Sequence, residues 1–241
     1  KELLAPAHQA AARKEAPRHF LMFEAHFGHV EVFDTVMPGL QNLQQVYKGA
    51  GVDCPIALVT RVRDPLDYYI SFFKWGVGFR QRDNPGTFGN NFTAWASRVP
   101  DLQSSLVLRG MSAAGAEYNG RFPARHRVDF GKVEAMLDQF SVVGTVERFD
   151  ETLLLTADLT GLPLLRYKRN TPINKGGYRG TRASICPDIE ACRRLIKHVA
   201  PTDYKMYEKY KPLFEKRLQA LGDDFARRVA LLKEDISSAQ P

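Results

Sequence analysis

The sequence predicts an α/β protein in which a mainly parallel sheet is flanked by helices, with a long helix near the C-terminal end. Two short apolar runs rich in β-branched residues, 56–62 and 141–146, predict buried strands, and each is followed directly by a helical pattern. This alternation of strand and helix is typical of parallel sheets. The long helix is predicted by apolar residues that recur every three or four positions from Tyr207 to Leu232.

The first fifty residues are expected to hold two helices and one strand. Residues 2–15 are rich in alanine, a strong helix former, and residues 38–47 begin with a proline that suits the first helical position. Residues 19–24 are expected to form a strand, which a glycine-containing turn follows at 25–29. The pattern at 30–36 does not distinguish a helix from a strand.

Residues 56–75 form the segment around which the rest of the chain is organised: a strand, a sharp turn and an amphipathic helix. Asp64 is a good N-cap, and Pro65 suits the first helical position because it has no N–H to leave unpaired. Arg63 stands at the carboxyl end of the strand, and Ser71 lies two turns into the helix.

Arg63 and Ser71 together indicate an anion site. Ligands of open α/β sheets bind at the carboxyl ends of strands, and an arginine beside a helix N-terminus favours a phosphate. A second interpretation stays open from these residues alone: Arg63 pairs with Asp64 or Asp67, and Ser71 lies on a solvated helix face.

The rest of the chain is expected to alternate helices with polar loops. Helices are predicted over 92–98, 132–140, 147–159 and 187–199, and irregular segments over 78–90, 110–128 and 167–182. Gly222 is a point at which the long C-terminal helix can kink or break. We therefore expect an α/β domain over 1–215 and a helical extension over 216–241.

The composition is that of an ordinary globular protein with a preference for anions. The chain has 241 residues, of which 44% are hydrophobic and 25% charged, and its net charge is +7. A basic balance favours an anionic ligand such as a nucleotide or a sulfated glycan. None of the common nucleic-acid-binding motifs occurs, so no nucleic-acid partner is expected. No run approaches the roughly 18 apolar residues of a membrane-spanning helix.

The cysteines and one glycosylation triplet bear on the compartment. Cys186 and Cys192 either pair across a short loop or stay free in the core, and Cys54 is left over. No histidine or cysteine cluster has the spacing of a zinc site, so no metal is expected. Asn91-Phe92-Thr93 is an N-glycosylation sequon, which has meaning only in a luminal or secreted chain.

Three further segments carry residues suited to chemistry. His29, in a turn after the first expected strand, is either a general base or a hydrogen-bonded turn residue. Glu147 and Arg148, at the end of the second strand, are expected to brace the sheet edge. The basic, glycine-rich segment 167–182 either closes over a phosphate or is a solvated loop.

In order and spacing, these segments resemble the sulfotransferases that use 3′-phosphoadenosine 5′-phosphosulfate, and specifically their Golgi carbohydrate branch. Within that branch the chain is most similar to the heparan and uronyl 2-O-sulfotransferases, over about residues 19–215. The matching elements are Gly28-His29-Val30, Arg63-Asp64-Pro65 with Ser71 eight residues after the arginine and Phe72-Phe73 behind it, Val143 to Phe149, a basic loop around Asn170, and Asp203 with Tyr207.

The resemblance implies a sulfotransferase fold of the P-loop-like kind and transfer of a sulfuryl group to a glycan, anionic or neutral, in the Golgi lumen. It assigns His29 as the catalytic base, with His26 and Glu24 as rivals. It also implies two binding roles. The cofactor's 3′-phosphate is bound by Arg63, Ser71, Tyr178, Arg179 and Gly180, and the glycan acceptor is bound by Arg80 and Arg82.

One departure from the family pattern qualifies this expectation. The family's 5′-phosphosulfate loop, a Pro-Lys-x-Gly-(Ser/Thr)-like turn, is absent from the sequence. A Gly-x-x-x-x-Gly-Lys-(Ser/Thr) loop is absent too, which disfavours a P-loop kinase. Either the loop, and a membrane anchor with it, precedes Lys1, or the protein is an inactive relative with a structural or binding role.

Overall fold

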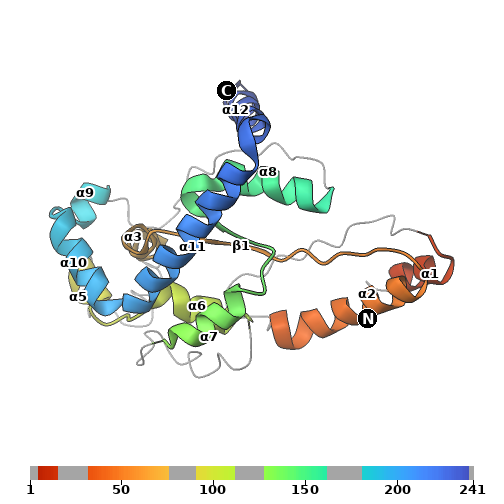
Figure 1. The fold of residues 1–241 in the computed structure, drawn as a ribbon. Helices are drawn as coiled ribbons and strands as arrows, with labels where there is room; N and C mark the ends of the chain where they lie inside the picture. Colours follow the sequence, from red (N-terminus) through yellow and green to blue (C-terminus); the bar gives the residue numbers. More distant parts are fainter. Residues whose placement is uncertain (1–4, 16–31, 76–90, 112–127, 162–180, 239–241) are drawn as a thin grey trace.

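The computed structural model describes residues 5–15, 32–75, 91–111, 128–161 and 181–238 (Figure 1). In this part of the chain the fold is mainly helical, with one two-stranded parallel sheet. The predicted combination of helices with parallel strands is therefore confirmed, but the described residues do not form the larger, mainly parallel sheet that we expected. The strand expected at 19–24 lies outside the described residues.

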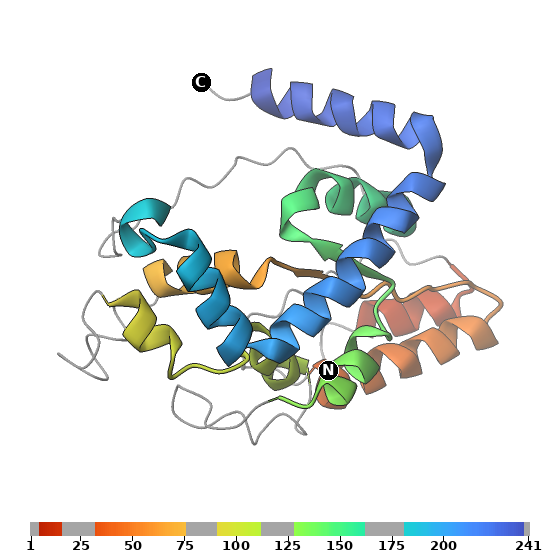
Figure 2. The ribbon, with the colours of Figure 1, turned by 60° about the vertical axis from the view of Figure 1, so that its left-hand side comes forward.

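The sheet consists of β1 (Val59–Val62) and β2 (Val142–Thr145), which are the two strands that the sequence predicts. They pair in parallel, with Val59 opposite Val142 and Val62 opposite Thr145. The helices α8 (Phe149–Thr160) and α11 (Pro201–Ala220) both contact β2, and α11 crosses the strands in both views (Figures 1 and 2). Helices therefore cover β2, in which Val142, Gly144 and Thr145 are buried. In β1 only Val62 is buried and Arg61 is exposed, so the expectation of two buried strands holds for β2 alone.

The N-terminal helices form a separate small cluster. Helix α1 (Ala5–Ala12) packs against α2 (Met37–Gly49) through Ala11, Leu43 and Tyr47, and the two helices lie side by side in Figures 1 and 2. Both correspond to predicted helices. The segment that the sequence left ambiguous forms a single π-helical turn, η2 (Val32–Val36), which runs directly into α2.

A second set of helices surrounds the helix that follows β1. Helix α3 (Pro65–Trp75) packs with α5 (Phe92–Ala96), α6 (Leu102–Met111) and α10 (Ile189–Val199). The aromatic side chains Tyr69, Phe73 and Trp95 are buried at the centre of this cluster. Helix α6 is an element that we did not predict, and its position matters for the site described below.

Helices α7 (Phe130–Leu137) and α8 are close to their predicted bounds, whereas α9 (Arg182–Ile185) was not predicted and the C-terminal helix differs from the prediction. Helix α7 precedes β2, the 3₁₀ turn η4 (Val146–Arg148) leads from β2 into α8, and the short α9 precedes α10. The long C-terminal helix is in fact two helices, α11 and α12 (Gly222–Ser238). They meet at Gly222, whose φ of +72° is a left-handed conformation that interrupts the helix.

Helix α12 packs back onto the body of the protein. Phe225, Val229 and Leu232 form one buried cluster with Leu154 and Leu155 of α8, so the apolar stripe read from the sequence faces a core. The expected domain boundary at 215/216 falls inside α11. None of the described helices is both long and apolar enough to cross a membrane.

Candidate functional site

The two parallel strands end at the same edge of the sheet, and this edge is the candidate site. The backbone N–H of Asp64, two residues after β1, donates to Glu147 Oε1, two residues after β2, at 3.0 Å. Asp64 in turn caps α3, because its Oδ1 accepts from the backbone N–H of Asp67 at 3.0 Å. The predicted N-cap is therefore confirmed, and Glu147 does brace the sheet edge.

A buried glutamine fixes the backbone of Arg63. Gln103 Oε1 accepts from the Arg63 N–H at 2.8 Å, and Gln103 Nε2 donates to the Arg63 carbonyl oxygen at 3.0 Å. The side-chain amide of Gln103 thus mimics a neighbouring strand, with both of its polar atoms satisfied by one residue. The side chain of Arg63 is half-buried, and these two hydrogen bonds fix the backbone that carries it.

A buried carboxylate holds Gln103. Asp203, in the first turn of α11, accepts from the backbone N–H of Gln103 at 3.0 Å and from that of Ser104 at 2.8 Å. It also accepts from the Ser104 hydroxyl at 2.5 Å. These donors lie in the first turn of α6, where a carboxylate also meets the positive end of the helix dipole. A chain of contacts therefore runs from Asp203 through Gln103 to Arg63.

Asp203 is fully buried, and this affects its titration. Burial raises the pKa of the Asp203 carboxyl to about 7, although the hydrogen bonds from Ser104 and from the two backbone N–H groups act in the opposite direction. The sequence singles out Asp203, together with Tyr207, as an element of the sulfotransferase resemblance. It does not indicate that Asp101 and Gln103 lie beside Asp203. The signal that could have found them is Pro100-Asp101 before the apolar pattern of residues 102–108, which is an N-terminal helix signature.

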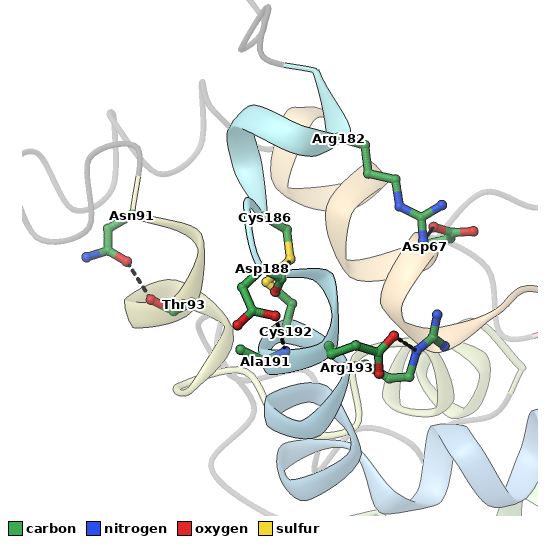
Figure 3. Close-up of a disulfide and its surroundings, with 10 residues drawn as sticks. Asp67, Asn91, Thr93, Arg182, Cys186, Asp188, Ala191, Cys192 and Arg193 are labelled. Atoms are coloured by element: carbon green, nitrogen blue, oxygen red, sulfur yellow. Dashed lines mark hydrogen bonds and ion pairs between the residues drawn. A yellow bond between two sulfur atoms is a disulfide. The ribbon is translucent and has the colours of Figure 1, made fainter.

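The acidic residues beside Arg63 are paired with other arginines. Asp67 lies 3.1 Å from the guanidinium of Arg182 (Figure 3), and Asp64 lies 3.7 Å from that of Arg193. Arg63 makes no ion pair with another residue in the described part of the chain. The interpretation in which Arg63 pairs with Asp64 or Asp67 is therefore wrong, and its guanidinium remains available to an anion.

Ser71 lies exposed on α3, and the two aromatic residues after it belong to the core. Phe73 is fully buried, and Phe72 stacks on Trp95 with 6.3 Å between the ring centroids. The helix therefore has a buried aromatic face and an exposed face that carries the hydroxyl. The exposure agrees both with a solvated serine and with one that receives a ligand.

Two tyrosines of α11 complete the edge. Burial, and then the negative charge of Asp64, raises the pKa of Tyr204, while Arg193 lowers it. Burial raises the pKa of Tyr207 too, with Glu147 and Asp64 as the next causes. Both phenols therefore stay protonated and can donate hydrogen bonds at neutral pH.

The second strand is held to α8 at a glycine. A Cβ at Gly144 would lie 2.3 Å from Thr152 Oγ1 and 2.7 Å from Thr152 Cγ2, so only glycine allows this approach. The following Arg148 pairs with Glu151 at 3.1 Å. The Gly144–Phe149 segment thus fixes where β2 ends, and with it the position of Glu147.

Several predicted site residues lie outside the described residues. These are Glu24, His26, His29, Arg80, Arg82, Asn170, Tyr178, Arg179 and Gly180. The described residues include no group of three histidine, cysteine, aspartate or glutamate side chains that could hold a metal ion. Of the residues that the sequence assigns to the catalytic, cofactor and acceptor sites, the structure therefore describes Arg63 and Ser71.

A disulfide lies next to the site. Cys186, at the end of α9, is bonded to Cys192 in α10, with 6.3 Å between the two Cα atoms (Figure 3). The pairing alternative from the sequence is therefore the one found, and Cys54 is a free, half-buried thiol. Because the disulfide joins the elements that carry Arg182 and Arg193, it also fixes the partners of Asp67 and Asp64.

No protein-family model, curated protein or solved structure matches this chain.

Proposed function

We propose that this chain is a sulfotransferase of the Golgi carbohydrate branch, which transfers a sulfuryl group from 3′-phosphoadenosine 5′-phosphosulfate to a hydroxyl of a glycan. The observation that carries the proposal is the situation of Arg63. Arg63 follows a parallel strand and precedes a helix. The two carboxylates nearest to it in sequence form ion pairs with Arg182 and Arg193 instead. Such a cation is suited to a terminal phosphate.

In this proposal each residue has a separate role. Arg63 and Ser71 hold the 3′-phosphate, with Tyr178, Arg179 and Gly180 closing over it, and the acceptor glycan contacts Arg80 and Arg82. His29 takes the proton of the acceptor hydroxyl as the new oxygen–sulfur bond forms and the bond from sulfur to the 5′-phosphate oxygen breaks. Like phosphoryl transfer, this reaction depends mainly on positioning and on stabilising charge.

The disulfide supports the luminal part of the proposal. Structural disulfides persist in the secretory pathway and are rare in the cytosol. The Cys186–Cys192 bond therefore favours a chain that folds in an oxidising compartment, as a Golgi carbohydrate sulfotransferase does.

An inactive, sulfotransferase-like interaction subunit is the alternative, and one observation favours it. The N–H groups of Asp64 and Asp67, at the start of α3, are already taken by Glu147 and Asp64. The helix N-terminus thus offers a phosphate fewer donors than an open one would. The sequence also contains no 5′-phosphosulfate loop.

Calorimetric titration of the full chain with 3′-phosphoadenosine 5′-phosphate tests the proposal. We expect binding, and we expect Arg63→Ala to weaken it about tenfold or more, because a hydrogen bond to a charged group contributes about 1.5–3 kcal/mol. Arg61→Ala is the matched control: it removes the same charge two residues earlier, from an exposed side chain that stacks on Phe149. Its affinity should fall clearly less than that of Arg63→Ala, because Arg61 is exposed and its side chain stacks on Phe149.

The outcomes separate the two functions. Binding together with transfer of labelled sulfate to an acidic or neutral glycan supports the enzyme. Binding without transfer supports the inactive alternative. A wild-type chain that does not bind the nucleotide, or one in which Arg61→Ala and Arg63→Ala weaken binding equally, contradicts the phosphate site.

A further inference from the structure

We propose that Asn91 carries an N-linked glycan. Asn91-Phe92-Thr93 is the only Asn-x-(Ser/Thr) triplet in the sequence, and its middle residue is not proline. The proposal requires that the chain enters the secretory pathway, and it does not depend on sulfuryl transfer. It therefore goes beyond the proposed function and can hold if that function fails.

Both reactive positions of the triplet face solvent in the folded chain. Asn91 and Thr93 are exposed, whereas Phe92 between them is 2% exposed. The Phe92 ring packs edge-on against Phe73, with 5.4 Å between centroids. The buried ring fixes the segment to the core, so the amide of Asn91 is held at the surface.

The fold uses only the oxygen of the Asn91 amide. Asn91 Oδ1 accepts from the backbone N–H of Ala94 at 3.0 Å and from the Thr93 hydroxyl at 2.9 Å (Figure 3). In the described part of the chain, Asn91 Nδ2 has no hydrogen-bond partner. Because a glycan attaches to Nδ2 and leaves Oδ1 in place, the modified residue keeps both hydrogen bonds.

The neighbourhood supports the compartment that this modification needs. The Cys186–Cys192 disulfide lies close to α5, since α10 contacts α5 directly. Disulfides form in the same oxidising lumen in which sequons are glycosylated. In Figure 3 the disulfide is seen between Asn91 and the Arg182–Asp67 pair.

The donor is a lipid diphosphate-linked oligosaccharide of the host. The bond from Nδ2 to the first sugar carbon forms as the bond from that carbon to the diphosphate oxygen breaks. The diphosphate leaves with the electron pair, and the amide nitrogen gives up one proton, which passes to the solvent. No oxidant or reductant is involved, and the chain itself supplies only the acceptor amide.

Translation of the full chain behind a secretory signal, in the presence of endoplasmic-reticulum microsomes, tests this proposal. Protection from added protease identifies the translocated chains. We expect these chains to show one glycan, removed by an endoglycosidase as a single mobility step. Mass spectrometry after enzymatic deglycosylation should find aspartate at position 91.

Three variants make the result specific. Thr93→Ser keeps the triplet and should keep the glycan, and Thr93→Ala should lose it. Asn91→Asp removes the nitrogen but keeps the oxygen that caps α5, so it should lose the glycan and keep the melting temperature of wild-type chains that were never glycosylated. Translocated wild-type chains without a glycan would overturn the proposal, as would a glycan that persists in Asn91→Asp.

Discussion

Asp101 and Asp203 each hold the start of the helix that the other residue introduces. Asp101, immediately before α6, accepts through Oδ1 from the backbone N–H of Thr202 at 2.9 Å. Asp203, in the first turn of α11, accepts from the backbone N–H groups of Gln103 and Ser104. The two helix starts, about a hundred residues apart in sequence, are therefore locked together by two carboxylates at the point that supports Arg63.

Titration of Asp203 should make the protein less stable as the pH rises from about 4 to 7. The pKa of this carboxyl is 3.8 when unperturbed and about 7 in the folded chain. Between these values the unfolded state has released the proton and the folded state still holds it, so a rise in pH favours unfolding. The contribution is fully present below pH 3.8 and is lost as the pH passes through 7.

The measurement is urea unfolding of the wild type and of Asp203→Asn at several pH values. The variant does not titrate at this position, so the wild type's advantage over it should be largest near pH 4 and should shrink up to pH 7. An advantage that is constant over this range, or that grows with pH, would mean that the folded carboxyl is ionised throughout.

Gly144→Ala should destabilise the protein by roughly 1–3 kcal/mol, the usual cost of overpacking. The new Cβ would meet the side chain of Thr152 at 2.3 Å, and Thr152 cannot move freely because its hydroxyl donates to the Arg148 carbonyl at 2.8 Å. Thr152→Ala in the same chain removes both of the closest atoms. The double variant should therefore lose less than the sum of the two single changes.

Gly39→Ala is the matched control for this clash. Gly39 lies in α2, and nothing lies within 4 Å of the Cβ that would be added. Alanine there should stabilise the protein by about 0.4–1 kcal/mol. Chemical unfolding of the wild type, Gly144→Ala, Thr152→Ala and the double variant gives the coupling energy between positions 144 and 152. Additive effects at these two positions would contradict the clash.

Gln103→Met should weaken nucleotide binding without contacting the nucleotide. The substitution keeps the volume and removes both hydrogen bonds to the Arg63 backbone. If these bonds position Arg63, Gln103→Met lowers the affinity for 3′-phosphoadenosine 5′-phosphate. Arg63→Ala then lowers the affinity less in the Gln103→Met background than in the wild type. Equal losses from Arg63→Ala in both backgrounds would indicate that Gln103 acts on stability alone.

The sequence predicted local structure well where short-range signals were complete. The strand at β1, the Asp64 cap with Pro65 behind it, and the stop at Gly161 (φ +67°) all follow from residues within one turn of each other. It did not predict α6 or the part of Gln103 in the site. Those depend on Asp203, which lies 100 residues away from Gln103 and therefore leaves no local pattern.

The pairing of charges at the site was also beyond sequence reasoning. Asp64 and Asp67 are the nearest acids to Arg63 in the chain, and neighbours on a helix surface often pair. The structure pairs them with Arg193 and Arg182 instead. Arg193 lies on α10, which packs against α3, and Arg182 lies on α9, which precedes α10. Which of several arginines meets a carboxylate is decided by tertiary packing.

Reduction of the Cys186–Cys192 bond should lower the free energy of unfolding by roughly 2 kcal/mol, as estimated for a loop closed over six residues. Thermal unfolding with and without a reductant measures the change. Cys54→Ser should show the same shift on reduction, because Cys54 is a free thiol. Cys186→Ser combined with Cys192→Ser should show none, and any shift in that variant would assign the effect to another group.

Glu151 should show the opposite pH dependence to Asp203. Burial alone would raise its pKa, but hydrogen bonds from its own backbone N–H, from Arg148 and from Lys233 hold the pKa below the usual value of 4.5. A lowered pKa contributes stability that is present above pH 4.5 and is lost as the pH falls through the folded value. The Lys233 contact, at 3.2 Å, also fastens α12 to α8.

Glu151→Gln tests this pH dependence, because it keeps an oxygen for both donors and removes the charge. The wild type should be more stable than the variant at neutral pH and should lose that advantage as the pH falls through the lowered pKa of the folded state. Lys216→Gln is the control for the change in net charge, because Lys216 is exposed on α11 and makes no ion pair within the described part of the chain. A wild-type advantage that persists in acid would show that Glu151 contributes through its shape and hydrogen bonds rather than its charge.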